Sequence, residues 1–194
     1  MDEKIITNAK EYIKALFEGN ADGHDEKHTL RVLKNAQSIA SSYPESDFLL
    51  ISLSALLHDV DDHKLFHTEN NENARSFLKE QGVESKKIEE ICSIINAVSF
   101  SKNKGKSPET IEGKIVQDAD RLDALGAIGI ARTFAYGGKN GRSLSDSVRH
   151  FYDKLLLLKD TMNTEEGRKI ADERHALMEA FLRELEQELS VSSL

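Results

Sequence analysis

The sequence has few of the residues that form tight turns or disulfides. Its 194 positions include two prolines, eleven glycines, one cysteine and no tryptophan. Average usage is about 5% proline and 7% glycine, so a fold built of many short strands and turns is disfavoured. Cys92 has no partner for an intramolecular disulfide and lies in an apolar-periodic run, which fits a reducing cytoplasm. These shortages favour helices.

The chain also lacks a positive charge surplus and a long apolar run. It has 34 acidic and 26 basic residues, a formal net charge of -8, which disfavours binding to a nucleic-acid polymer. A small anionic ligand would need a local cationic pocket. The densest apolar stretch, 48–57, falls well short of the ~20 residues that cross a bilayer, and the polar N-terminus has no features of a secretory signal. We therefore expect a cytoplasmic protein with no membrane partner.

Apolar periodicity predicts an all-α helical bundle. A composition of 39% apolar residues suits one core of ordinary size, so we expect one domain over residues 1–194, with a core at about 20–130 and C-terminal helices at about 145–190. Residues 46–60 are apolar on nearly every side and predict a central, enclosed helix. Ser107-Pro108 predicts a helix start, and the glycines of 137–141 predict a flexible loop. The other predicted helices are 2–18, 25–42, one ending at Gly82, 85–98, 145–158 and 165–189.

Three of the predicted helical segments carry polar groups at inward positions. His28 is in register with the apolar residues of its helix, His58 and Asp59 close the central helix, and Asp118 stands where an apolar residue is expected. Burying such groups without compensation is costly, whereas a divalent cation accepts lone pairs from all four. A lone inward histidine is most often a core residue whose nitrogens are hydrogen-bonded within the protein. The prediction of a metal site therefore depends on all four residues together.

Two imidazoles and two carboxylates suit a transition ion better than calcium, which prefers oxygen ligands alone. We expect one divalent ion. The sequence leaves manganese, magnesium, nickel, cobalt, iron and zinc open.

The order of these residues resembles a known family. His28, then His58-Asp59 within ALLHDVDDHK, then Asp118 within VQDADRLDALGAIGIAR is similar to the H...HD...D signature of the HD superfamily of metal-dependent phosphohydrolases. GHDEKHTLRV and QDADRLDALGA resemble more narrowly a compact bacterial group with YpgQ-like and YedJ-like hydrolases. This resemblance implies nucleotide pyrophosphohydrolase or phosphatase activity. In the HD-GYP branch the pair continues as HD-x-x-K, but Asp62 occupies that lysine's position, which favours a site for one metal.

Two carboxylates near the HD pair are candidates for moving the proton of an attacking water. Asp62 follows the pair by three residues, and Glu72 enters the next predicted helix. Either could instead cap a helix or lie in solvent, since acidic residues are favoured in the first turn of a helix.

Five basic residues are candidates for binding substrate phosphates. Arg31 lies one turn after His28 on the same helix and is the best placed of them. The others are Lys64, Arg121, Lys139 and Arg142. Each of these four could equally be a solvated surface cation.

The sequence thus predicts a metal-dependent phosphohydrolase of a nucleotide or other small phosphate ester or anhydride, and the resemblance implies nucleoside triphosphate pyrophosphohydrolysis as one form. Metal ions promote such reactions by lowering the pKa of a bound water. Two alternatives stay open. One is a di-iron HD oxygenase, for which His63, His67 and Glu72 lie near the motif. The other is a non-catalytic, regulatory module that binds metal and nucleotide.

Overall fold

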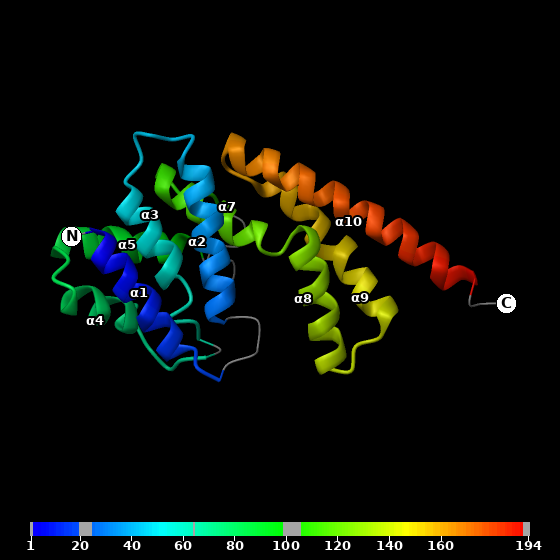
Figure 1. The fold of residues 1–194 in the computed structure, drawn as a ribbon, viewed down its shortest axis with the longest axis horizontal. Helices are drawn as coiled ribbons and strands as arrows, with labels where there is room; N and C mark the ends of the chain where they lie inside the picture. Colours follow the sequence, from blue (N-terminus) through cyan, green and yellow to red (C-terminus); the bar gives the residue numbers. More distant parts are fainter. Residues whose placement is uncertain (1, 20–24, 64, 99–105, 192–194) are drawn as a thin grey trace. The chain divides into compact units, whose positions relative to one another are not determined.

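A computed structural model describes residues 2–19, 25–63, 65–98 and 106–191 (Figure 1). All regular structure in these ranges is helical, which confirms the all-α prediction. Residues 1–120 and 121–194 form two compact units, and the single domain stays a prediction. The elements are α1 (Asp2–Leu16), α2 (Glu26–Ala40), α3 (Phe48–Leu57), α4 (Glu72–Glu80), α5 (Ser85–Val98), α7 (Ile111–Leu122), α8 (Gly126–Lys139), α9 (Leu144–His150), the π-helix η1 (Phe151–Leu155), the 3-10 helix η2 (Leu156–Thr161) and α10 (Glu165–Val191).

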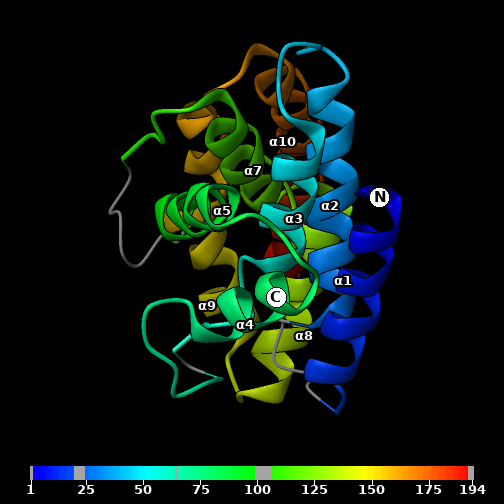
Figure 2. The ribbon, with the colours of Figure 1, turned by 90° about the vertical axis from the view of Figure 1, so that its left-hand side faces the viewer.

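The first unit is built around α3. This helix packs against α1, α2 and α5, and Figure 2 shows it beside α2. Every residue from Leu50 to Leu57 is buried, because apolar side chains cover nearly all sides of the helix and only Ser52 and Ser54 interrupt them. The predicted central helix is therefore confirmed, although it ends at Leu57 and leaves His58 as its C-cap.

Two predicted boundaries are wrong. Helix α7 begins at Ile111 and not at Pro108, because Thr110 caps it by accepting a hydrogen bond from the Gly113 amide at 3.1 Å. Gly137 and Gly138 continue α8 to Lys139 instead of forming a loop. A Cβ on Gly137 would lie 2.7 Å from Ser147 Oγ, so a larger residue there would displace this side chain of α9.

In the second unit, α10 packs against α8 and η2, and α9 packs against α8. The helix predicted at 145–158 is divided into α9, η1 and η2, whose hydrogen-bonding patterns differ. The turn that leads into α8 is held by an ion pair of Asp123 with Arg132 at 2.5 Å and by a hydrogen bond from Arg174 to the Leu122 carbonyl at 2.6 Å. No helix among the described residues has the length and apolar character needed to cross a membrane.

The central position of α3 predicts a large stability difference between two of its residues. Leu53 is 0% exposed and Phe48 is 50% exposed. Leu53→Ala should lower the free energy of unfolding by about 2–5 kcal/mol, because it leaves a cavity in the core. Phe48→Ala should lower it by less than about 1 kcal/mol. Urea unfolding measures both, and equal losses would contradict the enclosed position of α3.

Candidate metal centre

His28 is held in the first turn of α2. The N-cap residue Asp25 accepts a hydrogen bond from the His28 amide at 2.7 Å, which fixes where the helix starts. The side chain is buried, as are Val32, Ala36 and Ile39 on the same stripe. The predicted inward position of His28 is therefore confirmed.

His58 follows the last residue of α3, and its ring is fixed by the backbone. Nδ1 lies 2.8 Å from the Ala55 carbonyl oxygen. A carbonyl can only accept, so Nδ1 carries the hydrogen and the lone pair of a neutral ring is on Nε2. This Nε2 is buried and has no hydrogen-bond partner among the described residues, although the next residue's carboxylate is near.

Two carboxylates meet the imidazoles of His28 and His58. Asp59 Oδ2 lies 3.5 Å from His28 Nε2 and 3.3 Å from His58 Nε2. Asp120 Oδ1, from the last turn of α7, lies 3.4 Å from His28 Nε2 and 3.8 Å from His58 Nε2. Ligand atoms of His28, His58 and Asp120 all lie within 4.8 Å of one another. The carboxylates and imidazoles thus converge on one point in the first unit.

A hydrogen bond between α2 and α7 supports this convergence. Asn35 lies seven residues after His28, two turns along the same face of α2. Its Nδ2 donates to the Ala119 carbonyl at 3.2 Å, directly beside Asp120. The two helices are therefore tied together one residue from the carboxylate.

The carboxylate of α7 that lies beside the two histidines is that of Asp120, two residues after Asp118, the ligand predicted from the sequence. The two residues are about 200° apart around a helix of 3.6 residues per turn. Asp118 is 0% exposed, on the deeply buried face of α7 with Ile115 and Leu122. The Asp120 side chain is 31% exposed and reaches the histidines. Apolar periodicity identifies the most buried face of α7, whereas the imidazoles lie beside the nearly opposite face, which carries Asp120.

The charges in this cluster require a positive partner. Burial lowers the pKa of His58, but the negative charges of Asp59 and Asp120 outweigh it and raise the pKa to about 10. Burial raises the pKa of Asp120, but the hydrogen bond with His28 and the charge of His58 outweigh it and lower the pKa. A proton on His58 can supply compensating charge in the protein alone, and a divalent cation can supply it in its place.

The residues present fit such a cation. They combine two imidazoles with two carboxylates, and the second nitrogen of His58 is already oriented by a carbonyl, as is common for a metal-ligating histidine. The buried Nε2 that lacks a hydrogen bond is the expected donor atom. We call His28, His58, Asp59 and Asp120 the HD cluster.

The candidate bases differ in exposure. The Asp62 amide donates to the Asp59 carbonyl at 3.0 Å, so Asp62 lies in the turn that follows the HD pair. Its side chain is 17% exposed, and its Oδ1 lies 3.9 Å from His63 Nδ1. Glu72, the first residue of α4, is exposed.

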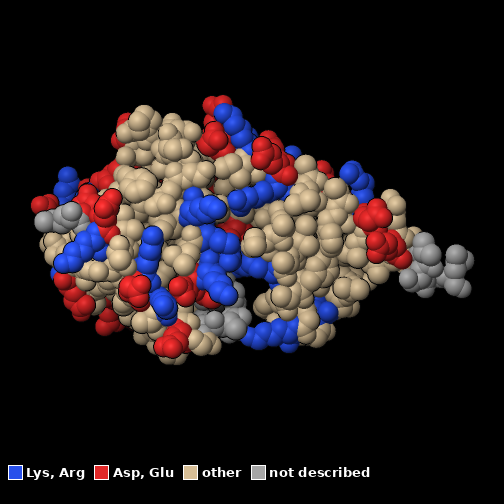
Figure 3. Space-filling model, viewed as in Figure 1, with Lys and Arg blue, Asp and Glu red and all other residues tan. Residues whose placement is uncertain are grey.

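The candidate phosphate-binding residues lie in both units. In the first, Arg31 is half-buried on α2, and Lys64 falls outside the described residues. In the second, the Arg121 guanidinium is buried and donates to the Thr161 carbonyl, and the Arg142 guanidinium lies 5.2 Å from the centre of the Tyr136 ring. Lys139 is exposed at the end of α8. Figure 3 shows basic side chains interspersed with acidic ones on the surface of the first unit.

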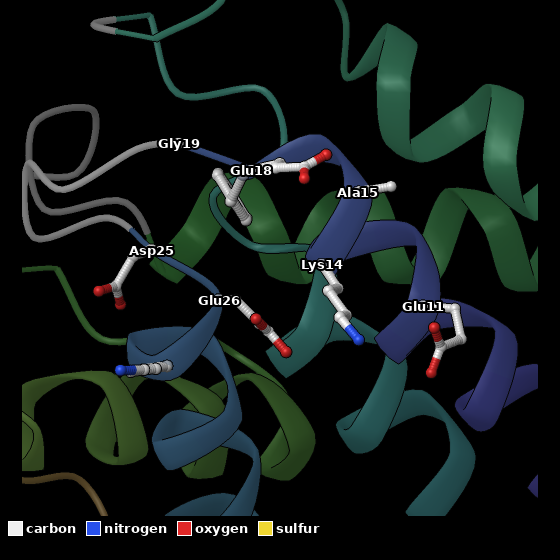
Figure 4. Close-up of a pocket in the computed structure, with 9 residues that line it drawn as sticks. Glu11, Lys14, Ala15, Glu18, Gly19, Asp25 and Glu26 are labelled. Carbon is white, nitrogen blue, oxygen red and sulfur yellow. The ribbon is translucent and has the colours of Figure 1, made fainter.

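A pocket of about 680 Å³ lies between the end of α1 and the start of α2 (Figure 4). Lys14 extends between Glu11 and Glu26 in this view. The lining includes four carboxylates and two lysines but none of the HD cluster. Its excess of negative charge disfavours the binding of a phosphate.

Comparison with known proteins identifies close relatives. The HD domain family model matches residues 26–125. The chain is 38% identical to YpgQ of Bacillus subtilis over 96% of this chain and 94% of the relative. A crystal structure of YpgQ in complex with ADP superposes with a TM-score of 0.81 at 34% identity, covering 94% and 97% of the two chains. An HD-superfamily hydrolase from Bacillus thuringiensis superposes with a TM-score of 0.82 at 39% identity, covering 98% and 99%. With a family model that matches more than half of its length and a relative of 38% identity, the chain belongs to the HD domain family.

Proposed function

We propose that this protein is a metal-dependent phosphohydrolase that acts on a nucleotide or another small phosphate ester or anhydride. The convergence of two imidazoles and two carboxylates in the HD cluster carries the proposal. The ADP complex of the relative YpgQ supports a nucleotide as the substrate class. Pyrophosphate release from a nucleoside triphosphate is one form of this reaction.

His28, His58, Asp59 and Asp120 would hold one divalent cation. Bound there, the cation supplies a Lewis acid for the phosphoryl group and lowers the pKa of water. Asp62 accepts the proton of the attacking water, since its carboxylate is partly buried in the turn beside Asp59. Glu72 is the less favoured base because it is exposed.

Arg31 binds a substrate phosphate in this proposal. It lies one turn after His28 on α2, and its guanidinium fork matches two phosphate oxygens. A protein with a formal charge of -8 needs such a cation close to the cluster.

Arg31→Ala should reduce kcat/KM by about 10–150-fold, the equivalent of roughly 1.5–3 kcal/mol for a charged hydrogen bond, with unchanged metal content. Arg31→Lys should restore only part of this loss, because lysine lacks the planar fork. Lys34→Ala is the matched control, since it removes an exposed cation one turn further along α2. Steady-state kinetics would contradict the assignment if Arg31→Ala and Lys34→Ala behaved alike.

The proposed function is tested with a panel of nucleoside mono-, di- and triphosphates. The full chain is freed of metal, reconstituted with one divalent ion at a time, and assayed for inorganic phosphate and pyrophosphate. We expect turnover of at least one nucleotide class, lost on chelation and recovered with the ion.

Two results would contradict hydrolysis. Nucleotide binding without turnover for every ion would indicate a regulatory module. Two irons per chain together with oxygen uptake would indicate an oxygenase.

A further inference from the structure

The start of α4 lacks an ordinary N-cap. Asn71 occupies the cap position in a left-handed conformation, φ 56°, and its side chain makes no capping bond. Its Oδ1 instead accepts a hydrogen bond from Asn96 Nδ2 of α5 at 2.9 Å. The first amides of the helix must therefore find acceptors elsewhere.

Asp61, which follows the HD pair by two residues, supplies those acceptors. Its Oδ1 accepts from the Asn73 amide at 2.9 Å, and its Oδ2 accepts from the Ala74 amide at 3.1 Å. The Asn73 side chain returns a bond from Nδ2 to the Val60 carbonyl at 2.7 Å. We call these three hydrogen bonds the clamp. It joins the turn after α3 to the start of α4 in both directions.

The clamp residues are direct neighbours of the candidate functional residues. Asp59 precedes Val60, Asp62 follows Asp61, and Glu72 precedes Asn73 in the chain. The Asp61 carboxylate uses both oxygens on α4, whereas the Asp59 carboxylate faces the imidazoles. A carboxylate at a helix N-terminus is also favoured by the helix dipole. The clamp thus restrains the backbone on one side of each candidate group.

We infer that Asp61 is a positioning residue of the metal site, which holds Asp59 toward His28 and His58 through the clamp. This inference rests on the metal site of the proposed function. It does not depend on the reaction, because ion binding is measured without substrate.

The test is Mn²⁺ binding to the full chain by isothermal titration calorimetry. Asp61→Asn keeps the side-chain size but places an amide donor against one of the two backbone donors. Loss of a group that orients a metal ligand typically weakens metal binding by 10–100-fold, so we expect about a tenfold rise in the Kd. The Asn73 and Ala74 amides should also exchange hydrogen faster.

Asp47→Asn is the matched control. Asp47 caps α3 by accepting from the Leu50 amide at 2.9 Å, and it binds Lys87 Nζ at 2.7 Å. The change is chemically the same, but the length of α3 separates it from His58. It should destabilise the fold without changing the Kd for Mn²⁺ by more than about twofold, since it orients no ligand.

Asn73→Ala provides an independent variant that removes the bond to the Val60 carbonyl. Because Asp61 and Asn73 both belong to the clamp, the double variant should bind Mn²⁺ with about the same Kd as whichever single variant binds it less tightly. Three results would overturn the inference: Asp61→Asn with the parent Kd or parent exchange rates, an equal loss in Asp47→Asn, or a double loss equal to the product of the single losses. A parent that binds Mn²⁺ normally but hydrolyses no phosphate would defeat only the proposed function.

Discussion

Asp120→Asn is expected to weaken Mn²⁺ binding by at least about 100-fold and to abolish hydrolysis with it. The Asp120 carboxylate lies 3.4 Å and 3.8 Å from the Nε2 atoms of the two histidines, so it belongs to the cluster itself. Loss of a group that only orients a ligand costs roughly 10–100-fold, and loss of a ligand costs more. Calorimetric titration with Mn²⁺ measures the first effect, and the nucleotide panel measures the second.

Asp118→Asn provides the comparison for this prediction. It makes the same chemical change two residues earlier on α7, at a fully buried position. Its unfolding temperature should fall, because burial makes the site sensitive to any lost interaction. Its affinity for Mn²⁺ should stay within about tenfold of the parent, below the loss expected for a ligand. If Asp118→Asn lost the metal while Asp120→Asn bound it, the original sequence assignment would be right and the cluster as described would be wrong.

Asp59→Ala is expected to remove both the bound metal and phosphate hydrolysis while most of the helicity remains. One oxygen of Asp59 lies 3.5 Å and 3.3 Å from the Nε2 atoms of His28 and His58, so the loss opens the centre of the cluster. The substitution deletes little core volume, and α3 keeps its buried apolar residues. Metal analysis by mass spectrometry and far-ultraviolet circular dichroism measure the two properties.

Chelation is the control for Asp59→Ala. Treating the parent with a chelator should reproduce the loss of activity, and added Mn²⁺ should restore the parent but not the variant. A variant with full metal content and normal turnover would remove Asp59 from the site.

Much of the first unit is predictable from the sequence because its helices have clear apolar patterns. Helix α5 spans Ser85–Val98, as predicted, and α3 is enclosed because it is apolar on nearly all sides. The inward position of His28 follows from the same reasoning, since it shares a stripe with Val32 and Ala36. Local periodicity is enough where one face of a helix must be buried.

The identity of the last carboxylate is not predictable in this way. Periodicity finds the side chains that are buried deepest, which include Asp118. A ligand must instead reach the histidines of two other helices, and that depends on how α7 is rotated against α2. The hydrogen bond from Asn35 to the Ala119 carbonyl is one of the contacts between these two helices. It joins residues 84 positions apart in the chain, so local periodicity does not reveal it.

Helix caps from distant residues are equally hidden from the sequence. The start of α4 depends on Asp61, twelve residues before Asn73, and not on a local capping residue. The prediction of one continuous α-helix at 145–158 was wrong. The segment changes from the α-helix α9 to a π-helix and then to a 3-10 helix, and the spacing of its apolar residues does not reveal these changes.

In the proposed function, one divalent cation is held by His28, His58, Asp59 and Asp120. A crystal of the protein loaded with Mn²⁺, with an anomalous difference map recorded at the manganese absorption edge, tests it most directly. We expect one anomalous peak per chain, within about 2.0–2.3 Å of the two imidazole nitrogens and of oxygens of both aspartates, as for protein-bound transition ions. A peak bonded to Asp118, a second peak beside the first, or no peak at the cluster would contradict it.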